Sequence, residues 1–415
     1  MEYGLIGKKL GHSFSREVHA AIADYPYELC ELSEDGVRSL MESRSFRAVN
    51  VTIPYKETVL PMLDVLSDSA AKIGAVNTVV NRNGKLYGYN TDYAGAAALL
   101  RHAGVSVTGK KVLLLGSGGT AKTLRAVVRD GEARQILTVS RRPENGAVSY
   151  TEAAARHSDA EILINTTPVG MFPDNDALPI NPDAFPSLCG VIDVIYNPLS
   201  TRLVLRAKER GIAAEGGLYM LAAQAVYASA LFTGSAAEDA AVDRICRKVL
   251  AEKRNIVLIG MPSSGKSSVG KRLAEKTNRP FFDTDEMVSR TAGKTVRAIF
   301  ETEGEQAFRK AEAEAVLRVS SENGAVIATG GGTVLDPRNT ERLRQNGLLL
   351  FLNRSPELLT PTPDRPLSPD ANAMQKKYRE RFPLYRALCD MTVPGDGTVE
   401  ETAALALSSF ASLSQ

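Results

Sequence analysis

Short apolar runs alternate with longer amphipathic segments along almost the whole chain. The runs are "KKVLLLG", "QILTVSR", "EILINTT" and "CGVIDVIY" between residues 110 and 196, then "NIVLIG", "GAVIATGGG" and "GLLLFLN" between residues 255 and 353. Continuous apolar runs separated by helix-like segments are typical of buried parallel strands joined by helices. The pattern therefore predicts an α/β protein with mostly parallel sheets.

The chain of 415 residues is too long for one ordinary core, so two or three domains are expected. The helical pattern that ends in "LFTG" at Gly234 is followed by a charged amphipathic segment, and a new strand-like run starts at Asn255. A glycine after a helical pattern is a typical helix end. We therefore predict a linker helix over residues 235–254, with a separate domain over 255–415.

Composition excludes several classes of protein. Hydrophobic residues make up 44% and charged residues 24%, and the net charge is +2, so we expect neither a nucleic-acid partner nor a membrane partner. The N-terminal segment lacks a signal-peptide pattern, which favours the cytoplasm. The cysteines have no paired spacing, and we expect four buried thiols in a reducing compartment: Cys30, Cys189, Cys246 and Cys389.

The segment "GMPSSGKSSVG" fits G-x-x-x-x-G-K-[ST] and lies between a strand-like run and a helical segment. That context is typical of a P-loop, in which backbone N–H groups surround the phosphates of a nucleotide. Lys266 would add a positive charge, and the Ser267 hydroxyl would ligate Mg²⁺. The predicted ATP site consists of Gly260, Ser263, Ser264, Gly265, Lys266, Ser267 and Ser268.

A second glycine-rich turn, "GSGGTA", also joins a strand-like run to a helix. Its spacing is a variant of the dinucleotide-binding fingerprint. The predicted contacts to the pyrophosphate come from Gly116, Ser117, Gly118, Gly119, Thr120 and Ala121. The next strand ends in Ser140, Arg141 and Arg142, where an NAD enzyme would carry an acidic residue, and this favours NADP. Surface arginines at a strand end are the alternative.

Other polar residues interrupt apolar stretches, among them Asn50, Asn77 and Asn90. Buried polar groups need partners, and these partners could be either protein groups or a substrate. Asp283 and Asp285 lie two residues apart at the end of a strand-like run, so both carboxylates would point to one side. A solvated strand end is the alternative. Arg309 and Glu312, one helical turn apart, could simply form an ion pair.

In order along residues 1 to 234, "GHSFS", "NVTIPYK", "GAVNT", "GYNTD", "GSGGTA", "NTTPVGM", "DVIYNP" and "GGLYMLAAQA" resemble shikimate dehydrogenase. The resemblance implies a substrate lobe over 1–103, completed by 200–234, and a Rossmann-type NADP lobe over 104–199. It implies that Lys56 and Asp92 form the catalytic pair and that Met171 and Gly217 approach the nicotinamide. The implied shikimate contacts are Ser13, Ser15, Thr52, Asn77, Asp92, Tyr196 and Gln224.

From residue 255 onward the P-loop, "DTD", "GEQAFRKAE", "TGGG", "DRPL" and "RFPLYRALCD" resemble shikimate kinase. The resemblance implies a parallel sheet flanked by helices, with Asp283 beside Mg²⁺ and the reacting hydroxyl, and Arg365 on a closing lid. The implied shikimate contacts are Asp285, Arg309, Gly330, Gly331, Gly332 and Arg381. The implied lid between Pro356 and Arg381 is proline-rich and is shorter after Arg365 than is usual in this family, which bears on rate and nucleotide preference.

Both resemblances involve the same metabolite. Together they imply one enzyme that reduces 3-dehydroshikimate with NADPH and then phosphorylates shikimate with ATP and Mg²⁺. A dehydrogenase that prefers quinate is an alternative for the first half, and a regulatory nucleotide-binding domain is an alternative for the second. The expected partners are small molecules, and the sequence allows a monomer or a homodimer.

Overall fold

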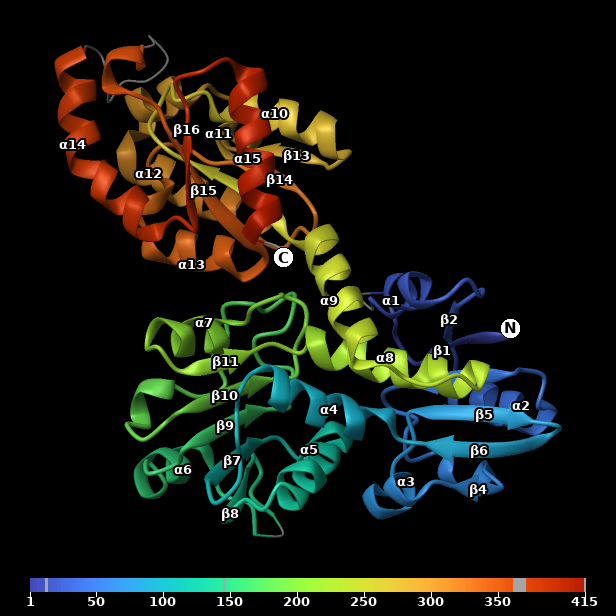
Figure 1. Cartoon of the computed structure of the whole chain (residues 1–415). Helices are drawn as coiled ribbons and strands as arrows, with labels where there is room; N and C mark the ends of the chain where they lie inside the picture. Colours follow the sequence, from blue (N-terminus) through green and yellow to red (C-terminus); the bar gives the residue numbers. More distant parts are fainter. Residues whose placement is uncertain (12–13, 145, 361–370, 414–415) are drawn as a thin grey trace. The chain divides into compact units, whose positions relative to one another are not determined.

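A computed structural model describes residues 1–11, 14–144, 146–360 and 371–413 (Figure 1). The chain divides into two compact units, Met1–Val249 and Leu250–Gln415. The division falls within α9 (Asp239–Lys253), the helix that occupies most of the predicted linker.

The first unit begins with a mixed sheet. Its strands lie in the order β2 (Glu28–Glu31), β1 (Tyr3–Gly7), β3 (Ala48–Val51), β5 (Thr78–Arg82), β6 (Lys85–Tyr89) and β4 (Val65–Leu66). β1 is parallel to β2 and β3, whereas β5 is antiparallel to both β3 and β6. β5 and β6 form a hairpin that turns at Asn83 and Gly84, both with positive φ, which suits the right-handed twist of the strands.

Helices surround this first sheet and complete its lobe. They are α1 (Ser15–Ile22), α2 (Glu34–Ser43), α3 (Asp68–Ile73), α4 (Thr91–His102) and α8 (Leu218–Thr233), with a 3-10 turn η1 (Leu60–Met62). α8 carries no charged residue because it is buried between α1, α4 and β5. Phe232 of α8 stacks on Tyr3 of β1 with ring centroids 5.6 Å apart.

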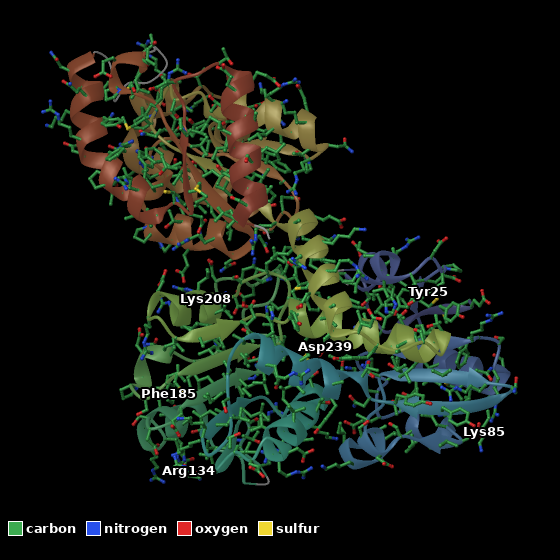
Figure 2. The ribbon with its side chains drawn as sticks, in the orientation of Figure 1. Tyr25, Lys85, Arg134, Phe185, Lys208 and Asp239 are labelled. Atoms are coloured by element: carbon green, nitrogen blue, oxygen red, sulfur yellow. The ribbon has the colours of Figure 1, made fainter. Side chains whose placement is uncertain are left out.

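The second sheet of the first unit is wholly parallel. Its strands lie in the order β11 (Ala213–Glu215), β10 (Gly190–Asp193), β9 (Ile162–Asn165), β7 (Lys111–Leu115) and β8 (Gln135–Val139). The surrounding elements are α5 (Gly119–Asp130), α6 (Tyr150–Arg156), η2 (Pro182–Ala184) and α7 (Arg202–Glu209). Phe185, labelled in Figure 2, is fully buried in this lobe's core with Leu163 and Leu203.

One predicted boundary is wrong. Residues 200–234 were expected to complete the substrate lobe, and residues 104–199 to form the nucleotide lobe. However, α7 lies against β10, and β11 pairs with β10, so residues up to Glu215 belong to the nucleotide lobe. The completing segment is α8, whose uncharged and largely buried surface packs against α1 and α4.

The second unit holds a third sheet, which is also parallel. Its strands lie in the order β13 (Phe281–Asp283), β14 (Val326–Ala328), β12 (Asn255–Ile259), β15 (Gly347–Asn353) and β16 (Met391–Pro394). The helical elements are α10 (Lys266–Thr277), α11 (Thr284–Ala292), α12 (Val296–Val319), η3 (Thr333–Leu335), α13 (Pro337–Asn346), η4 (Pro356–Leu358), α14 (Ala371–Leu388) and α15 (Val399–Leu413).

Alternate residues of β12 enter two separate cores, as the period of a strand requires. Val257 and Ile259 pack with residues of α12, α13 and α14, whereas Ile256 and Leu258 pack with residues of α10 and α15. The sheet is therefore covered by helices on both faces, which confirms the α/β architecture predicted from the continuous apolar runs.

The cysteines are less buried than expected. Cys189 is exposed, and Cys30, Cys246 and Cys389 are half-buried; all four are free thiols. No helix within the described ranges is both long enough and apolar enough to span a bilayer.

Candidate active sites

A cavity of about 550 Å³ lies between the two lobes of the first unit. Its walls include Thr52 and Asn77 from the first lobe and Thr166 and Tyr196 from the second. Most of the predicted substrate residues line it. They are Ser15, Thr52, Lys56, Asn77, Asp92, Tyr196 and Gln224, together with Thr120, Met171 and Gly217 from the predicted cofactor set. Ser13 lies outside the described residues.

Lys56 and Asp92 come together in this cavity. Lys56 Nζ lies 2.6 Å from Asp92 Oδ2, and both side chains are largely shielded from solvent. Asp92 stands in the first turn of α4, where Asn90 caps the helix by accepting from the Tyr93 N–H at 3.1 Å. A lysine ammonium held by a carboxylate can donate a proton to, or stabilise, a developing alkoxide.

The buried asparagines bond to protein groups. Asn77 Oδ1 accepts from the Thr91 N–H at 2.7 Å, and Asn50 Nδ2 donates to Thr78 Oγ1 at 3.0 Å. Tyr27, which no sequence pattern singled out, donates its hydroxyl to Asn50 Oδ1 at 2.7 Å and also lines the cavity. The asparagines thus have structural partners while they still face the space that a substrate would occupy.

An aromatic layer lies behind Tyr27. The buried His19 ring stacks on Tyr27 with centroids 3.8 Å apart, and His19 Nδ1 lies 2.6 Å from the hydroxyl of Tyr25, labelled in Figure 2. Burial lowers the pKa of His19 to about 3, so the ring is neutral. His19 is therefore a packing residue.

The dinucleotide fingerprint lies at the carboxyl end of β7. Gly116 has φ +107°, and a Cβ there would come within 2.7 Å of Thr166 Oγ1, so only glycine fits. α5 begins at Gly119, which directs its first N–H groups toward the turn. The Gly116 N–H donates to Val139 O at 2.9 Å, and this brings Ser140 and the exposed Arg141 and Arg142 to the same edge of the sheet.

Asp193 ties together two loops that line the cavity. Its Oδ1 accepts from Asn165 Nδ2 and from the Ile195 N–H, each at 3.1 Å, and its Oδ2 accepts from Thr201 Oγ1 at 2.7 Å. Burial raises the pKa of Asp193 to about 7, and the three donors limit the rise. No sequence pattern indicated this role, because a lone aspartate at a strand end has many uses.

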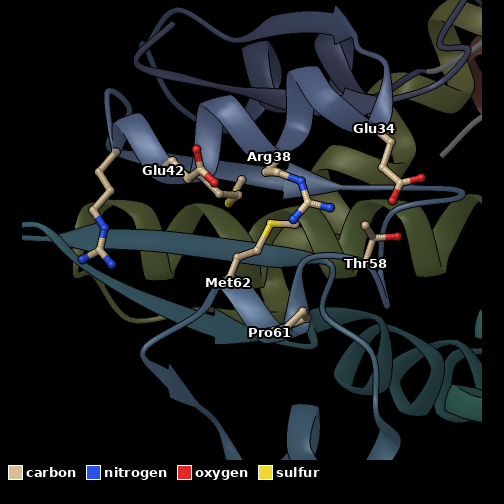
Figure 3. Close-up of a pocket in the computed structure, with 8 residues that line it drawn as sticks. Glu34, Arg38, Glu42, Thr58, Pro61 and Met62 are labelled. Carbon is tan, nitrogen blue, oxygen red and sulfur yellow. The ribbon is translucent and has the colours of Figure 1, made fainter.

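A hollow of about 640 Å³ on the surface beside α2 and η1 is a different feature (Figure 3). Figure 3 shows Arg38 among the acidic residues Glu34 and Glu42, with Met62 below. None of the predicted site residues that the structure describes lines it. Its exposed charges of both signs resemble an ordinary solvated helix face, and we assign it no chemistry.

The P-loop of the second unit joins β12 to α10. Lys266 is the first residue of α10, and its buried Nζ donates to the carbonyls of Gly260 and Met261 at 3.0 and 2.8 Å. These bonds hold the ammonium over the loop. Ser263, in the same loop, has φ +64°, a conformation that turns the backbone N–H groups inward.

Ser267 and Asp283 provide an oxygen pair suited to Mg²⁺. Ser267 Oγ donates to Asp283 Oδ2 at 2.5 Å, and hard oxygen donors are what this ion prefers. The predicted geometry of Asp283 and Asp285 is wrong in one respect. Only Asp283 ends a strand, because α11 starts at Thr284 and Asp283 caps it by accepting from the N–H groups of Asp285 and Glu286.

Asp285 nevertheless reaches the glycine-rich turn Gly330–Gly332. A Cβ at Gly330 would come within 2.5 Å of Asp285 Oδ1 and Glu312 Oε1, and a Cβ at Gly332 would overlap the Arg309 guanidinium. Arg381 Nη1 donates to Gly331 O at 2.9 Å, and the Tyr385 hydroxyl donates to the same oxygen at 2.5 Å. These bonds position the turn between two arginines.

The ion pair considered as the alternative role of Arg309 is present: Arg309 Nη1 lies 2.7 Å from Glu312 Oε2. Glu312 is almost fully buried and also accepts from Thr333 Oγ1 at 2.8 Å, so it orients Arg309. Lys377, missed by the sequence reasoning, adds a third cation. Burial and the nearby Arg381 lower its pKa to about 8. Arg365 lies outside the described residues.

These two sites define a two-lobed, dinucleotide-dependent oxidoreductase followed by a P-loop kinase. The family model of the shikimate dehydrogenase substrate binding domain matches residues 5–79, and the shikimate kinase model matches residues 262–411. The chain belongs to the shikimate dehydrogenase family and carries a shikimate kinase domain in its second unit.

Curated and solved relatives agree with this assignment. The shikimate dehydrogenase (NADP(+)) of Clostridium perfringens (strain SM101 / Type A) is 38% identical over 250 residues, which cover 56% of this chain and 92% of the relative. A chorismate mutase/shikimate 5-dehydrogenase fusion protein from Clostridium acetobutylicum matches with 34% identity and a TM-score of 0.57, covering 59% of this chain and 95% of the other. Shikimate 5-dehydrogenase from Thermus thermophilus, in complex with NADP(H) and shikimate, matches with 30% identity and a TM-score of 0.54. The match covers 60% of this chain and 99% of the other.

Proposed function

We propose that the chain catalyses two consecutive reactions of the shikimate pathway. The first unit reduces 3-dehydroshikimate to shikimate with NADPH, and the second transfers a phosphoryl group from ATP to the 3-hydroxyl of shikimate. The observation that carries the proposal is the Lys56–Asp92 pair, 2.6 Å apart in a cavity next to a dinucleotide fingerprint, in a chain that also holds a P-loop.

In the first reaction, bound NADPH would supply the hydride, and Lys56 would supply the proton. The carbonyl oxygen gains negative charge as the hydride adds to its carbon, and the ammonium beside it stabilises that charge and then protonates it. Asp92 keeps Lys56 in place. The remaining polar walls, including Ser15, Thr52 and Gln224, would bind the hydroxyl and carboxylate groups of the substrate.

The cofactor assignment rests on Ser140, Arg141 and Arg142 at the end of β8. Guanidinium groups bind a ribose 2′-phosphate through charge-assisted hydrogen bonds. The proposed pyrophosphate contacts are the backbone of Gly116 to Ala121 at the start of α5.

In the second reaction, the P-loop and Lys266 would hold the phosphates of ATP. Ser267 and Asp283 are the residues that would hold Mg²⁺, which neutralises charge on the transferred phosphoryl group when bound. Arg309 and Arg381 flank the glycine turn and would bind the shikimate carboxylate, because a planar guanidinium fits a carboxylate through two parallel bonds. Asp285 would accept from a shikimate hydroxyl.

A two-stage assay of the whole chain tests both reactions. Supplied with 3-dehydroshikimate and NADPH, the protein should oxidise NADPH; after addition of Mg-ATP it should form ADP and shikimate 3-phosphate in equal amounts. Quinate offered with NADP⁺ should be oxidised much more slowly than shikimate. NADPH oxidation without phosphorylation would favour a regulatory second unit, and faster quinate oxidation would favour the quinate alternative.

We further propose three parts of the chain: a substrate lobe over 1–103 completed by α8, a nucleotide lobe over 104–215, and a kinase domain from residue 255. We also propose that the protein is located in the cytoplasm. The nearly neutral net charge of +2 suits small-molecule substrates.

A further inference from the structure

Arg354 lies beside the P-loop, although it belongs to a different strand. It follows β15 directly, and β15 is parallel to β12, with Phe351 opposite Ile259. The carboxyl ends of both strands therefore lie at the same edge of the sheet, where ligands of parallel α/β sheets bind. A methyl group placed on Gly265 of the P-loop would be 3.8 Å from Arg354 Nη1, so the guanidinium reaches the loop itself.

The guanidinium of Arg354 has an unused hydrogen-bond donor. Its Nε atom is buried and has no hydrogen-bond partner among the residues that the structure describes. Buried polar groups without partners are rare because losing their hydration is unfavourable. Such a group close to a ligand-binding loop is therefore suited to a partner that arrives with the ligand.

Asp396 is the acidic group near Arg354, and it is engaged elsewhere. Its carboxylate accepts from the Ser355 hydroxyl at 2.5 Å and from the Ser355 N–H at 2.7 Å. These two bonds lower the pKa of Asp396 more than the charge of Arg354 does. Within the described ranges, Arg354 forms no ion pair with it or with any other carboxylate. The charged side chain within the loop itself is Lys266, which is also a cation, and the nearby Asp283 carboxylate is bonded to Ser267.

We propose that Arg354 binds oxygens of the nucleotide phosphate chain and acts beside Lys266 as a second cationic group of the P-loop. The proposal deepens the kinase function proposed above and rests on it. A guanidinium presents several N–H donors in one plane and suits phosphate oxygens, whereas the lysine acts as a point charge. Arg354 is distinct from Arg309 and Arg381, which flank the glycine turn.

The test compares Arg354→Gln and Arg354→Lys in the full chain with a matched control, Arg338→Gln. Arg338 lies in the same unit, where it is exposed and paired with Asp336 at 3.0 Å. Titration calorimetry with ADP and with a non-hydrolysable ATP analogue, both with Mg²⁺, measures nucleotide affinity without turnover. Kinase assays give KM for ATP and for shikimate separately. NADPH oxidation by the first unit normalises the amount of chain in each sample, and the melting temperature reports whether the second unit is folded.

We expect Arg354→Gln to weaken nucleotide binding and to raise KM for ATP about tenfold or more, with KM for shikimate unchanged. Arg354→Lys should recover part of the loss, because it keeps the charge but not the planar fork. The control should stay within about twofold of the parent. Because Arg354 forms no hydrogen bond or ion pair within the described ranges, the melting temperature of Arg354→Gln should change little.

Two results would overturn the inference. If the nucleotide affinity of Arg354→Gln is unchanged, Arg354 does not contact the phosphates. A lower melting temperature with equal losses for both substrates would make Arg354 a structural residue. If the parent protein itself neither binds nucleotide nor phosphorylates shikimate, the proposed kinase function fails instead, so the two failures are distinguishable.

Discussion

The Lys56 ammonium lies 2.6 Å from the Asp92 carboxylate, although 36 residues separate them in the chain. Lys56 follows β3 in a turn, and Asp92 begins α4, so the pair depends on the fold of the whole first lobe. Its position in the cavity between the lobes makes it the centre of the proposed reduction.

Replacing Lys56 with Met should lower kcat for NADPH oxidation by about 10²–10⁴, the usual range for loss of general acid catalysis. Asp92→Asn should lower kcat less, because the ammonium remains. The double variant should be little worse than Lys56→Met alone, since the two groups act as a unit. Steady-state kinetics of all three variants measure this, with kinase activity as the control. Additive losses would contradict a coupled pair.

Replacing Lys266 with Ala should reduce phosphorylation of shikimate by roughly 10²–10³, as loss of a donor to a charged transition state does. NADPH oxidation should be unchanged, because the two units have separate cores. Both rates are measured on the same purified sample. Simultaneous loss of both activities would mean that the units depend on each other to fold.

The double variant Arg141→Ala/Arg142→Ala should raise KM for NADPH about tenfold, because one charge-assisted hydrogen bond is worth roughly 1.4 kcal/mol or more. KM for NADH should change little, since NADH lacks the 2′-phosphate. The two cofactors are compared at saturating 3-dehydroshikimate. Equal rises for both cofactors would show that these arginines do not select NADP.

Asp193 should make the stability of the first unit depend on pH. Its pKa is raised to about 7 by burial, so the folded state binds a proton more tightly than the unfolded state, whose aspartates titrate near 4. The contribution of Asp193 to the free energy of unfolding is therefore greatest below about pH 4. It declines by at most about 4 kcal/mol as the pH rises to about 7.

Thermal inactivation of NADPH oxidation between pH 5 and 8 tests this prediction, with inactivation of the kinase as the internal reference. In Asp193→Asn the decline with pH should be smaller than in the parent. A parent enzyme whose first unit gains stability between pH 5 and 7, relative to this variant, would contradict the raised pKa.

Lys377 should make shikimate binding by the kinase depend on pH. Burial and the charge of Arg381 lower its pKa to about 8, so Lys377 is charged below pH 8 and attracts the shikimate carboxylate there. KM for shikimate should rise as pH passes from about 7.5 to 9. In Lys377→Met, KM should be higher at pH 7 and flat over this range, whereas an unchanged profile would exclude Lys377 from the site.

Sequence alone predicted the parallel sheets and both glycine-rich turns, because these depend on local patterns: continuous apolar runs, and glycines at fixed spacing before a helix. It placed α7 and β11 in the wrong lobe, because lobe membership depends on which sheet a strand joins. It also placed Asp285 on a strand. In the structure the strand ends at Asp283, which caps α11, and the sequence pattern did not reveal this cap.

The roles of Tyr27, Asp193 and Lys377, and the bond from Thr333 to Glu312, could not be predicted in this way. Three of these relationships join groups that are distant in sequence: Tyr27 with Asn50, Asp193 with Asn165, and Glu312 with Thr333. The shifted pKa of Lys377 depends on its burial and on the nearby Arg381. A single tyrosine or acidic residue in a helix or strand gives no periodic signal, so only the folded arrangement reveals its role.

The return of α8 to the first lobe also affects the order of events during synthesis. The core around Tyr3 and Tyr27 includes Ala228 and Phe232, so it cannot close until the ribosome has released those residues. At typical elongation rates this takes roughly ten to fifty seconds. By then all strands of the second sheet have been synthesised. The nucleotide lobe can therefore finish folding first, although the chain begins with the substrate lobe.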